Sequence, residues 1–217
     1  MNIKCIFFDL DGTLADTSID MCNALNSVLL NNKFKTVDCN KLKTHISRGA
    51  KGIISYASDV NGRPIDSSLL RAEFLQEYSE KCFIHTTLIK NMMKLIDHII
   101  SNNILCGVVT NKHSKFVKKI INGLQLDTKL SCIVTGDMVA EPKPSSEGLL
   151  EACRLVNVAA TDCIYVGDDE RDIIAGKNAG MFTVAADFGF VNKDEDLKSW
   201  QADMIVNDPI ELISLII

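Results

Sequence analysis

The sequence predicts an α/β fold, with a parallel sheet that has helices packed against it and a helical segment inserted after the first strand. Short apolar runs recur along the chain without polar alternation, as in strands that are covered on both faces. Amphipathic stretches of helical length lie between these runs. Strands that alternate with helices of this length indicate βαβ units. The 217 residues are enough for one large domain that carries a smaller insert.

Six apolar runs are the predicted strands. In chain order they are 3–8, 104–109, 132–134, 163–166, 182–185 and 204–206. Four helices are predicted between them, at 91–102, 116–124, 146–156 and 170–179. In the first of these helices the apolar residues fall on one stripe, and Gly180 follows the last helix, as is typical of a helix end. We therefore expect a Rossmann-like, doubly wound sheet.

The connection between the first two strands is much longer than a crossover needs. A crossover takes about a dozen residues, whereas the chain runs from Asp9 to Ile104 before the next strand begins. Helical patterns fill this span, at 19–30, 41–45, 52–59 and 68–82. We expect residues 17–85 to form an inserted α-helical domain, with 1–16 and 86–217 forming the α/β core.

Composition narrows the classes of function and location. The net charge is -5, and the chain has no run of Lys and Arg, so nucleic acid is not an expected partner. No apolar stretch approaches the roughly 18 residues of a membrane span, and no membrane partner is expected. The eight cysteines are never closer than ten residues, which gives no zinc spacing. We expect buried, reduced thiols without disulfides and a cytoplasmic protein.

Acidic residues follow two of the predicted strands. Asp9 and Asp11 end the first strand, and Asp168, Asp169 and Asp172 follow the strand at 163–166. The carboxyl ends of parallel strands meet at one edge of a sheet, where ligands bind. Crowded carboxylates repel one another unless a cation intervenes, and Mg²⁺ prefers such oxygen ligands. The alternatives are a simple turn at Asp11 and a charged helix start at 168–172.

Two further motifs are suited to an anion. Thr110 and Asn111 follow the strand at 104–109, where a hydroxyl and backbone N–H groups at a helix start can hold phosphate oxygens. Lys143 stands between two prolines, which stiffen the backbone that carries its ammonium group. Taken singly, these residues could be a helix cap and a solvated loop lysine. Together with the acidic residues they predict a Mg²⁺ site beside a phosphate site.

With these motifs the chain resembles the haloacid dehalogenase-like (HAD) hydrolase superfamily over essentially its whole length. The matching stretches are D-L-D-G-T-L-A-D-T at 9–17, V-V-T-N at 108–111, P-K-P at 142–144 and V-G-D-D-E-R-D at 166–172. The insert after the first motif stands where that family places its type-one helical cap. Within the family the chain looks most like the phosphoglycolate phosphatase branch, and its tail is also similar to N-acetylmuramic acid 6-phosphate phosphatases.

The resemblance implies covalent catalysis. Asp9 would be the nucleophile that forms an aspartyl-phosphate, and Asp11 would be the general acid and then the general base. Thr110, Asn111 and Lys143 would hold the phosphoryl oxygens. An acid at position 11 also argues against a true dehalogenase.

The resemblance also implies a metal site. Asp9, the backbone carbonyl of Asp11 and Asp168 would hold Mg²⁺. Asp169 or Asp172 would lie in the surroundings of the ion or join it through water, and the sequence leaves open which of these acids binds directly.

In this family the cap closes over the leaving group and selects the substrate. The stretch that contains Arg48, Gly49 and Lys51 is the expected specificity element, and Arg48 is the candidate partner of a substrate carboxylate. A solvated arginine on a cap turn is the alternative. The expected substrate is a small phosphorylated metabolite, first phosphoglycolate.

Other functions stay open on the sequence alone. N-acetylmuramic acid 6-phosphate or another sugar phosphate is an alternative substrate, and a β-phosphoglucomutase-like mutase is an alternative enzyme. A receiver-like or silent phosphate-binding module is the non-enzymatic alternative. The order of the motifs and the long insert disfavour a receiver domain.

Overall fold

The computed structural model describes residues 2–64 and 67–216. Among these residues, six strands form one wholly parallel sheet in the order β5-β4-β1-β6-β7-β8. The strands are β1 (Cys5–Phe8), β4 (Leu105–Val109), β5 (Cys132–Val134), β6 (Cys163–Gly167), β7 (Phe182–Ala186) and β8 (Met204–Val206). Each coincides with a predicted run, so the predicted α/β, Rossmann-like parallel sheet is confirmed.

Helices cover both faces of the sheet. Successive residues of β1 point to opposite faces, and Ile6 and Phe8 belong to one apolar cluster while Cys5 and Phe7 belong to another. The first cluster contains residues of α5 (Met92–Ser101) and α6 (Ser114–Gly123), and the second contains residues of α7 (Glu147–Val156) and α8 (Glu170–Ala179). Because both faces are buried, the strands read as continuous apolar runs.

The four core helices lie where the sequence predicts them, and their ends differ from the predicted ones by no more than two residues. Helix α8 spans the predicted residues because its end signals are local: Asp169 forms a capping box with Asp172, and Gly180 takes a left-handed conformation. Helix α6 begins two residues earlier than predicted, after His113, whose side chain accepts a hydrogen bond from the N–H of Lys115.

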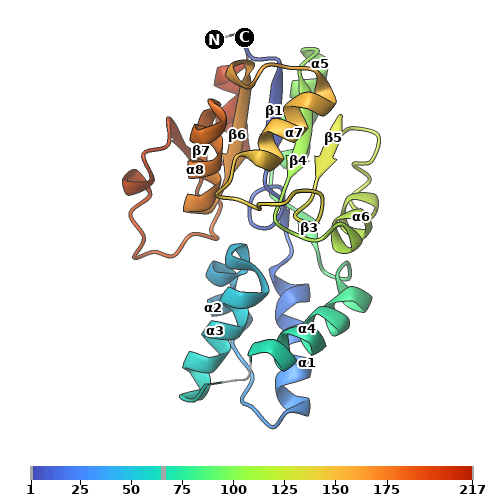
Figure 1. Ribbon diagram of the computed structural model, residues 1–217, viewed down its shortest axis with the longest axis vertical. Helices are drawn as coiled ribbons and strands as arrows, with labels where there is room; N and C mark the ends of the chain where they lie inside the picture. The colour runs from blue at the N-terminus through green and yellow to red at the C-terminus, as the bar shows by residue number, and fades with distance from the viewer. Residues whose placement is uncertain (1, 65–66, 217) are drawn as a thin grey trace.

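The helical span, formed by residues 17–64 and 67–85, lies below the sheet in Figure 1. Its elements are α1 (Ser18–Asn31), α2 (Cys39–Leu42), a 3₁₀ helix (Lys43–Arg48), α3 (Gly49–Asn61) and α4 (Ser67–Lys81). They enclose an apolar cluster of their own, which includes Leu25, Leu42, Ile53 and Phe74. Two core residues, Phe116 and Phe190, pack into that cluster and so join the helical part to the α/β part.

A short antiparallel pair connects the two parts. Strand β2 (Ala15–Asp16) leads into the helical span, and β3 (Thr87–Leu88) leads out of it. Neither strand of this pair is among the predicted ones, because two residues are too few for a periodic pattern. The two linkers therefore run side by side between the helices and the sheet.

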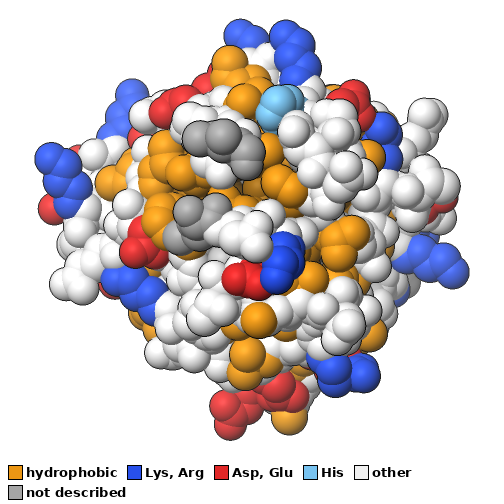
Figure 2. Space-filling model, turned by 90° about the horizontal axis from the view of Figure 1, so that it is seen from above, with side chains coloured by type: hydrophobic (Ala, Val, Ile, Leu, Met, Phe, Trp, Pro, Cys, Tyr) orange, Lys and Arg blue, Asp and Glu red, His pale blue; other side chains and the backbone are white. Residues whose placement is uncertain are grey.

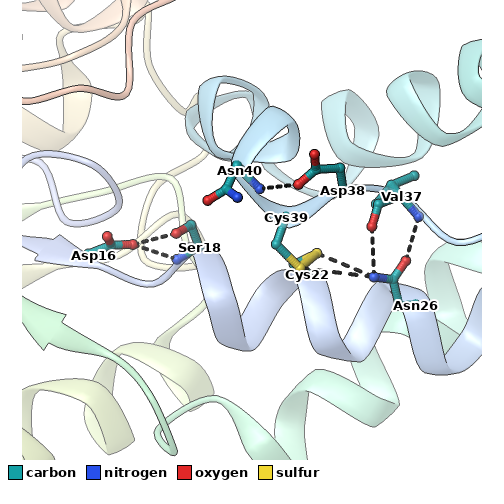
Figure 3. Close-up of a disulfide and its surroundings, with 8 residues drawn as sticks. All are labelled: Asp16, Ser18, Cys22, Asn26, Val37, Asp38, Cys39 and Asn40. Carbon is teal, nitrogen blue, oxygen red and sulfur yellow. Dashed lines mark hydrogen bonds between the residues drawn. A yellow bond between two sulfur atoms is a disulfide. The ribbon is translucent and has the colours of Figure 1, made fainter.

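The expectation of free thiols throughout is wrong at one pair of cysteines. Cys22 of α1 and Cys39 of α2 form a disulfide (Figure 3). The side chain of Asn26 fixes the neighbouring chain, since it donates to the carbonyl of Val37 at 3.0 Å and accepts from its N–H at 2.8 Å. A spacing of 17 residues carries no signal of such contact. The other described cysteines are free and buried, as expected.

One face of the molecule shows no single dominant charge. On the face seen in Figure 2, Lys and Arg side chains alternate with Asp and Glu side chains around the rim, and apolar side chains lie between them. Within the described ranges no helix combines the length and the apolar character needed to cross a bilayer.

Candidate active site

The polar residues predicted from sequence gather at the carboxyl edge of the sheet. Asp9 follows β1, Thr110 follows β4 and Asp168 follows β6, and these three strands are neighbours in the sheet. A cavity of about 560 Å³ lies between this edge and the helical span. Its walls include the predicted residues Asp9, Asp11, Thr110, Asn111, Lys143, Asp169, Asp172, Arg48, Gly49 and Lys51.

Three buried carboxylates form an acidic cluster, and two of them, Asp9 and Asp172, line this cavity. One oxygen each from Asp9, Asp168 and Asp172 lies within 4.8 Å of the others. Burial, with the charges of Asp9 and Asp172, raises the pKa of Asp168 well above its ordinary value. Burial likewise raises the pKa of Asp172 to about 6. Hard oxygen donors crowded in this way fit Mg²⁺, which removes the repulsion between them.

Asp169 has a different environment from its neighbours. Its side chain accepts hydrogen bonds from the N–H and the guanidinium of Arg171. Despite the cost of burial, the bonds from Arg171 hold the pKa of Asp169 below its ordinary value. Asp168 and Asp172 therefore face Asp9, while Asp169 faces Arg171.

Lys143 is surrounded by partners. Its Nζ donates to Asp9 Oδ1 at 2.6 Å, to Asp172 Oδ1 at 2.6 Å and to Tyr165 Oη at 2.7 Å. Burial alone would lower its pKa, but the charges of Asp172 and Asp9 raise the pKa of Lys143 above its ordinary value. The side chain of Asn111 holds the lysine loop, since it accepts from the Lys143 N–H at 2.8 Å and donates to its carbonyl at 3.0 Å.

Asp11 also lines the cavity and has a cation of its own. Lys112 Nζ donates to Asp11 Oδ1 at 2.9 Å and to Oδ2 at 3.0 Å, and the Thr17 hydroxyl also donates to Oδ1. Lys112 directly follows the V-V-T-N stretch at 108–111, and the motifs in the sequence predict no role for it. Tyr165 is missed as well, because nothing near it in sequence signals that its hydroxyl reaches Lys143.

A serine of the helical span contacts the acidic cluster. The Ser47 hydroxyl donates to Asp168 Oδ2 and lies 3.4 Å from the backbone carbonyl oxygen of Asp11. Arg171 in turn donates to the Ser47 carbonyl at 2.8 Å. Arg48, the predicted specificity residue, lines the cavity but is half exposed and lies 3.6 Å from Glu195.

Comparisons with known proteins support the resemblance stated above. A family described as haloacid dehalogenase-like hydrolase matches residues 6–186. An N-acetylmuramic acid 6-phosphate phosphatase of Pseudomonas putida is 34% identical over 216 residues, which covers 100% of this chain and 97% of the relative. A phosphoglycolate phosphatase of Xanthomonas campestris is 34% identical over 212 residues, which covers 96% and 94% of the two chains.

The fold is shared with solved structures. A protein of Haemophilus somnus described as a predicted phosphoglycolate phosphatase superposes with a TM-score of 0.88, at 23% identity, over 99% of this chain and 98% of its own. At this identity the likeness concerns the fold alone.

Proposed function

Because the chain belongs to the haloacid dehalogenase-like hydrolase family, we propose that it is a Mg²⁺-dependent phosphomonoesterase that acts through an aspartyl-phosphate. One observation carries this proposal above the others. Asp9 lies on the cavity wall, its carboxylate contacts the Lys143 ammonium at 2.6 Å, and it belongs to the cluster with Asp168 and Asp172. A carboxylate that contacts a buried cation and belongs to an acidic cluster suited to Mg²⁺ can receive a phosphoryl group.

In the first step, a carboxylate oxygen of Asp9 attacks phosphorus, and the bond from phosphorus to the ester oxygen breaks. Asp11 gives a proton to the departing alcohol. In the second step, a water molecule attacks phosphorus and gives its proton to Asp11, and inorganic phosphate leaves Asp9 as a free carboxylate. Lys143, Thr110 and the N–H of Asn111 hold the phosphoryl oxygens while charge shifts between them.

Asp9, Asp168 and the backbone carbonyl of Asp11 would hold Mg²⁺, with Asp172 joining directly or through water. The bound ion would offset the charge of the carboxylates and of the phosphoryl oxygens. The environment of Asp169, which faces Arg171, supports a role outside the direct ligand set.

Residues 17–85 would act as the cap, and Arg48, Gly49 and Lys51 on the cavity wall would contact the leaving group. Two candidate substrates follow from the names of the relatives, phosphoglycolate and N-acetylmuramic acid 6-phosphate. Both compounds carry a carboxylate. A cytoplasmic location remains part of the proposal, supported by the buried free thiols outside the Cys22–Cys39 pair.

The proposal is tested by measuring inorganic phosphate released from a panel of phosphomonoesters, with Mg²⁺ and with a chelator. The panel contains phosphoglycolate, N-acetylmuramic acid 6-phosphate and glucose phosphates. Mg²⁺-dependent release that strongly favours one ester is expected. Release that is equal in the chelator would contradict the metal site.

The nucleophile is tested by Asp9→Asn. We expect turnover to fall at least about 10³-fold, because an amide cannot form the aspartyl-phosphate, while the melting curve keeps its cooperative form. Asp127→Asn, at an exposed aspartate after α6, is the matched control and should keep wild-type turnover. Near-wild-type activity of Asp9→Asn would overturn the mechanism.

A further inference from the structure

Lys112 is a buried cation for which the proposed mechanism has no use. Its side chain is only 6% exposed, and its Nζ contacts both oxygens of Asp11. A two-point contact of this kind fixes the plane of the carboxylate as well as its position.

Aromatic rings from both parts of the protein enclose the other side of Lys112. Its Nζ lies 4.7 Å from the ring centroid of Tyr78 in α4 and 6.0 Å from that of Phe116 in α6. The two rings pack against each other with centroids 5.1 Å apart. Cations are attracted to ring faces at such distances. The ammonium group is thus held between the acid of the core and the inner wall of the helical span.

A general acid must lie within hydrogen-bond reach of the atom that it protonates, and a misplacement of about 1 Å can cost about 10²-fold in rate. We propose that Lys112 is a positioning residue: when one oxygen of Asp11 carries the proton for the leaving group, Lys112 donates to the other oxygen and so holds the carboxyl group in place. The rings of Tyr78 and Phe116 hold Lys112 in turn. This inference rests on the general-acid role proposed for Asp11.

The dependence of rate on the leaving group tests the inference. An alkyl alcohol leaves only with a proton, whereas p-nitrophenol leaves readily as an anion. The second step is the same for every ester, whereas kcat/KM reports the steps up to departure of the alcohol. Asp11 and Lys112 should therefore matter for kcat/KM of the alkyl ester and much less for kcat/KM of p-nitrophenyl phosphate. The alkyl ester is phosphoglycolate or N-acetylmuramic acid 6-phosphate, whichever the wild-type enzyme hydrolyses faster.

Lys112→Met keeps the length of the side chain and removes its charge and donors. We expect kcat/KM for the alkyl ester to fall about 100-fold, mainly through kcat, and that for p-nitrophenyl phosphate to fall less than about threefold. Lys112→Arg, which still offers two donors to a carboxylate, should recover most of the loss. The matched control is Lys115→Met, which removes a cation 4.7 Å from the same Phe116 ring. This substitution should change kcat/KM for the two esters by the same factor.

Asp11→Asn, assayed on the same two esters, separates this inference from the proposed function. If Asp11→Asn lowers kcat/KM equally for both esters, the general-acid role itself fails. If Asp11→Asn discriminates between the esters and Lys112→Met does not, the positioning role of Lys112 is overturned. In the Asp11→Asn background Lys112→Met should have little further effect on the alkyl ester, because the two residues act as a unit. If Lys112→Met does not melt cooperatively, Lys112→Gln is judged by the same criterion.

Discussion

At the scale of single residues, Gly12 allows the two acidic motifs to meet. Its φ of +89° lies in the left-handed region, and a Cβ there would collide with the carboxylate of Asp168. The D-L-D-G-T stretch therefore needs a glycine for two independent reasons. One is the conformation of the backbone, and the other is the close approach of Asp168, a member of the acidic cluster.

We expect Gly12→Ala to lower the free energy of unfolding by about 1–3 kcal/mol and to weaken Mg²⁺ binding, because Asp168 must move away from the new methyl group. Denaturant unfolding and calorimetric Mg²⁺ titration measure the two effects. Gly62→Ala is the control, since Gly62 has a φ of +62° but open space around it. If Gly12→Ala affected Mg²⁺ binding no more than Gly62→Ala, the close approach would have no functional meaning.

The sequence was sufficient to locate the residues whose motifs are local. Asp9, Asp11 and Asp168 stand at strand ends, so the alternation of strands and helices brings them to one edge. Lys112 and Tyr165 could not be assigned in this way. Their partners, Asp11 and Lys143, lie 101 and 22 residues away in the chain, and only the folded structure shows which side chains meet.

At the scale of secondary-structure elements, one buried aspartate ties the entrance of the helical span to its exit. Asp20 of α1 is 2% exposed, and its carboxylate accepts hydrogen bonds from the N–H groups of Ile84, His85 and Thr86 and from the Thr86 hydroxyl. These bonds hold the segment after α4 against the start of α1, next to the β2–β3 pair.

We expect Asp20→Ala to lower the free energy of unfolding by about 3 kcal/mol or more, because several buried donors would lose a charged acceptor at once. Denaturant unfolding measures the loss. The control is Asp59→Ala, at an exposed aspartate of α3, which should change stability by less than about 0.5 kcal/mol. An equal effect of the two substitutions would show that Asp20 does not fix the linkers.

Elements differed in how far the sequence could define them. The C-terminal end of α8 followed from Gly180, which acts within a few residues. The β2–β3 pair forms only because the linkers return to the same place after some seventy residues, and the Cys22–Cys39 disulfide depends on how α1 and α2 pack. Contacts of this kind are set by tertiary structure, and no local pattern encodes them.

At the scale of the whole molecule, the acidic cluster should link stability to Mg²⁺ and pH. In the metal-free protein the pKa of Asp168 and that of Asp172 are raised, so the folded state holds protons that the unfolded state has released. Their contribution to stability is present at low pH and is lost as the pH rises through the folded-state pKa, about 6 for Asp172.

Mg²⁺ should therefore raise the melting temperature more at pH 7.5 than at pH 5. At 100 times its dissociation constant the ion stabilises the fold by about 2.7 kcal/mol, which corresponds to a rise of roughly 5–10 °C for a chain of this size. At pH 5 bound protons compete with the ion. Thermal melts with Mg²⁺ and with a chelator at both pH values measure the difference, and a larger rise at pH 5 would contradict this account of the cluster.

The position of β1 in the centre of the sheet has a consequence for the order of events during synthesis. Cys5 pairs with Leu105 on one side and with Cys163 on the other, so the strand made first must wait for about a hundred further residues before its first partner exists. At ~5–20 residues per second, the wait lasts roughly 5–20 s. All the helices of the insert are translated during that time. A nascent chain thus has the opportunity to fold the helical part before the site that it covers can form.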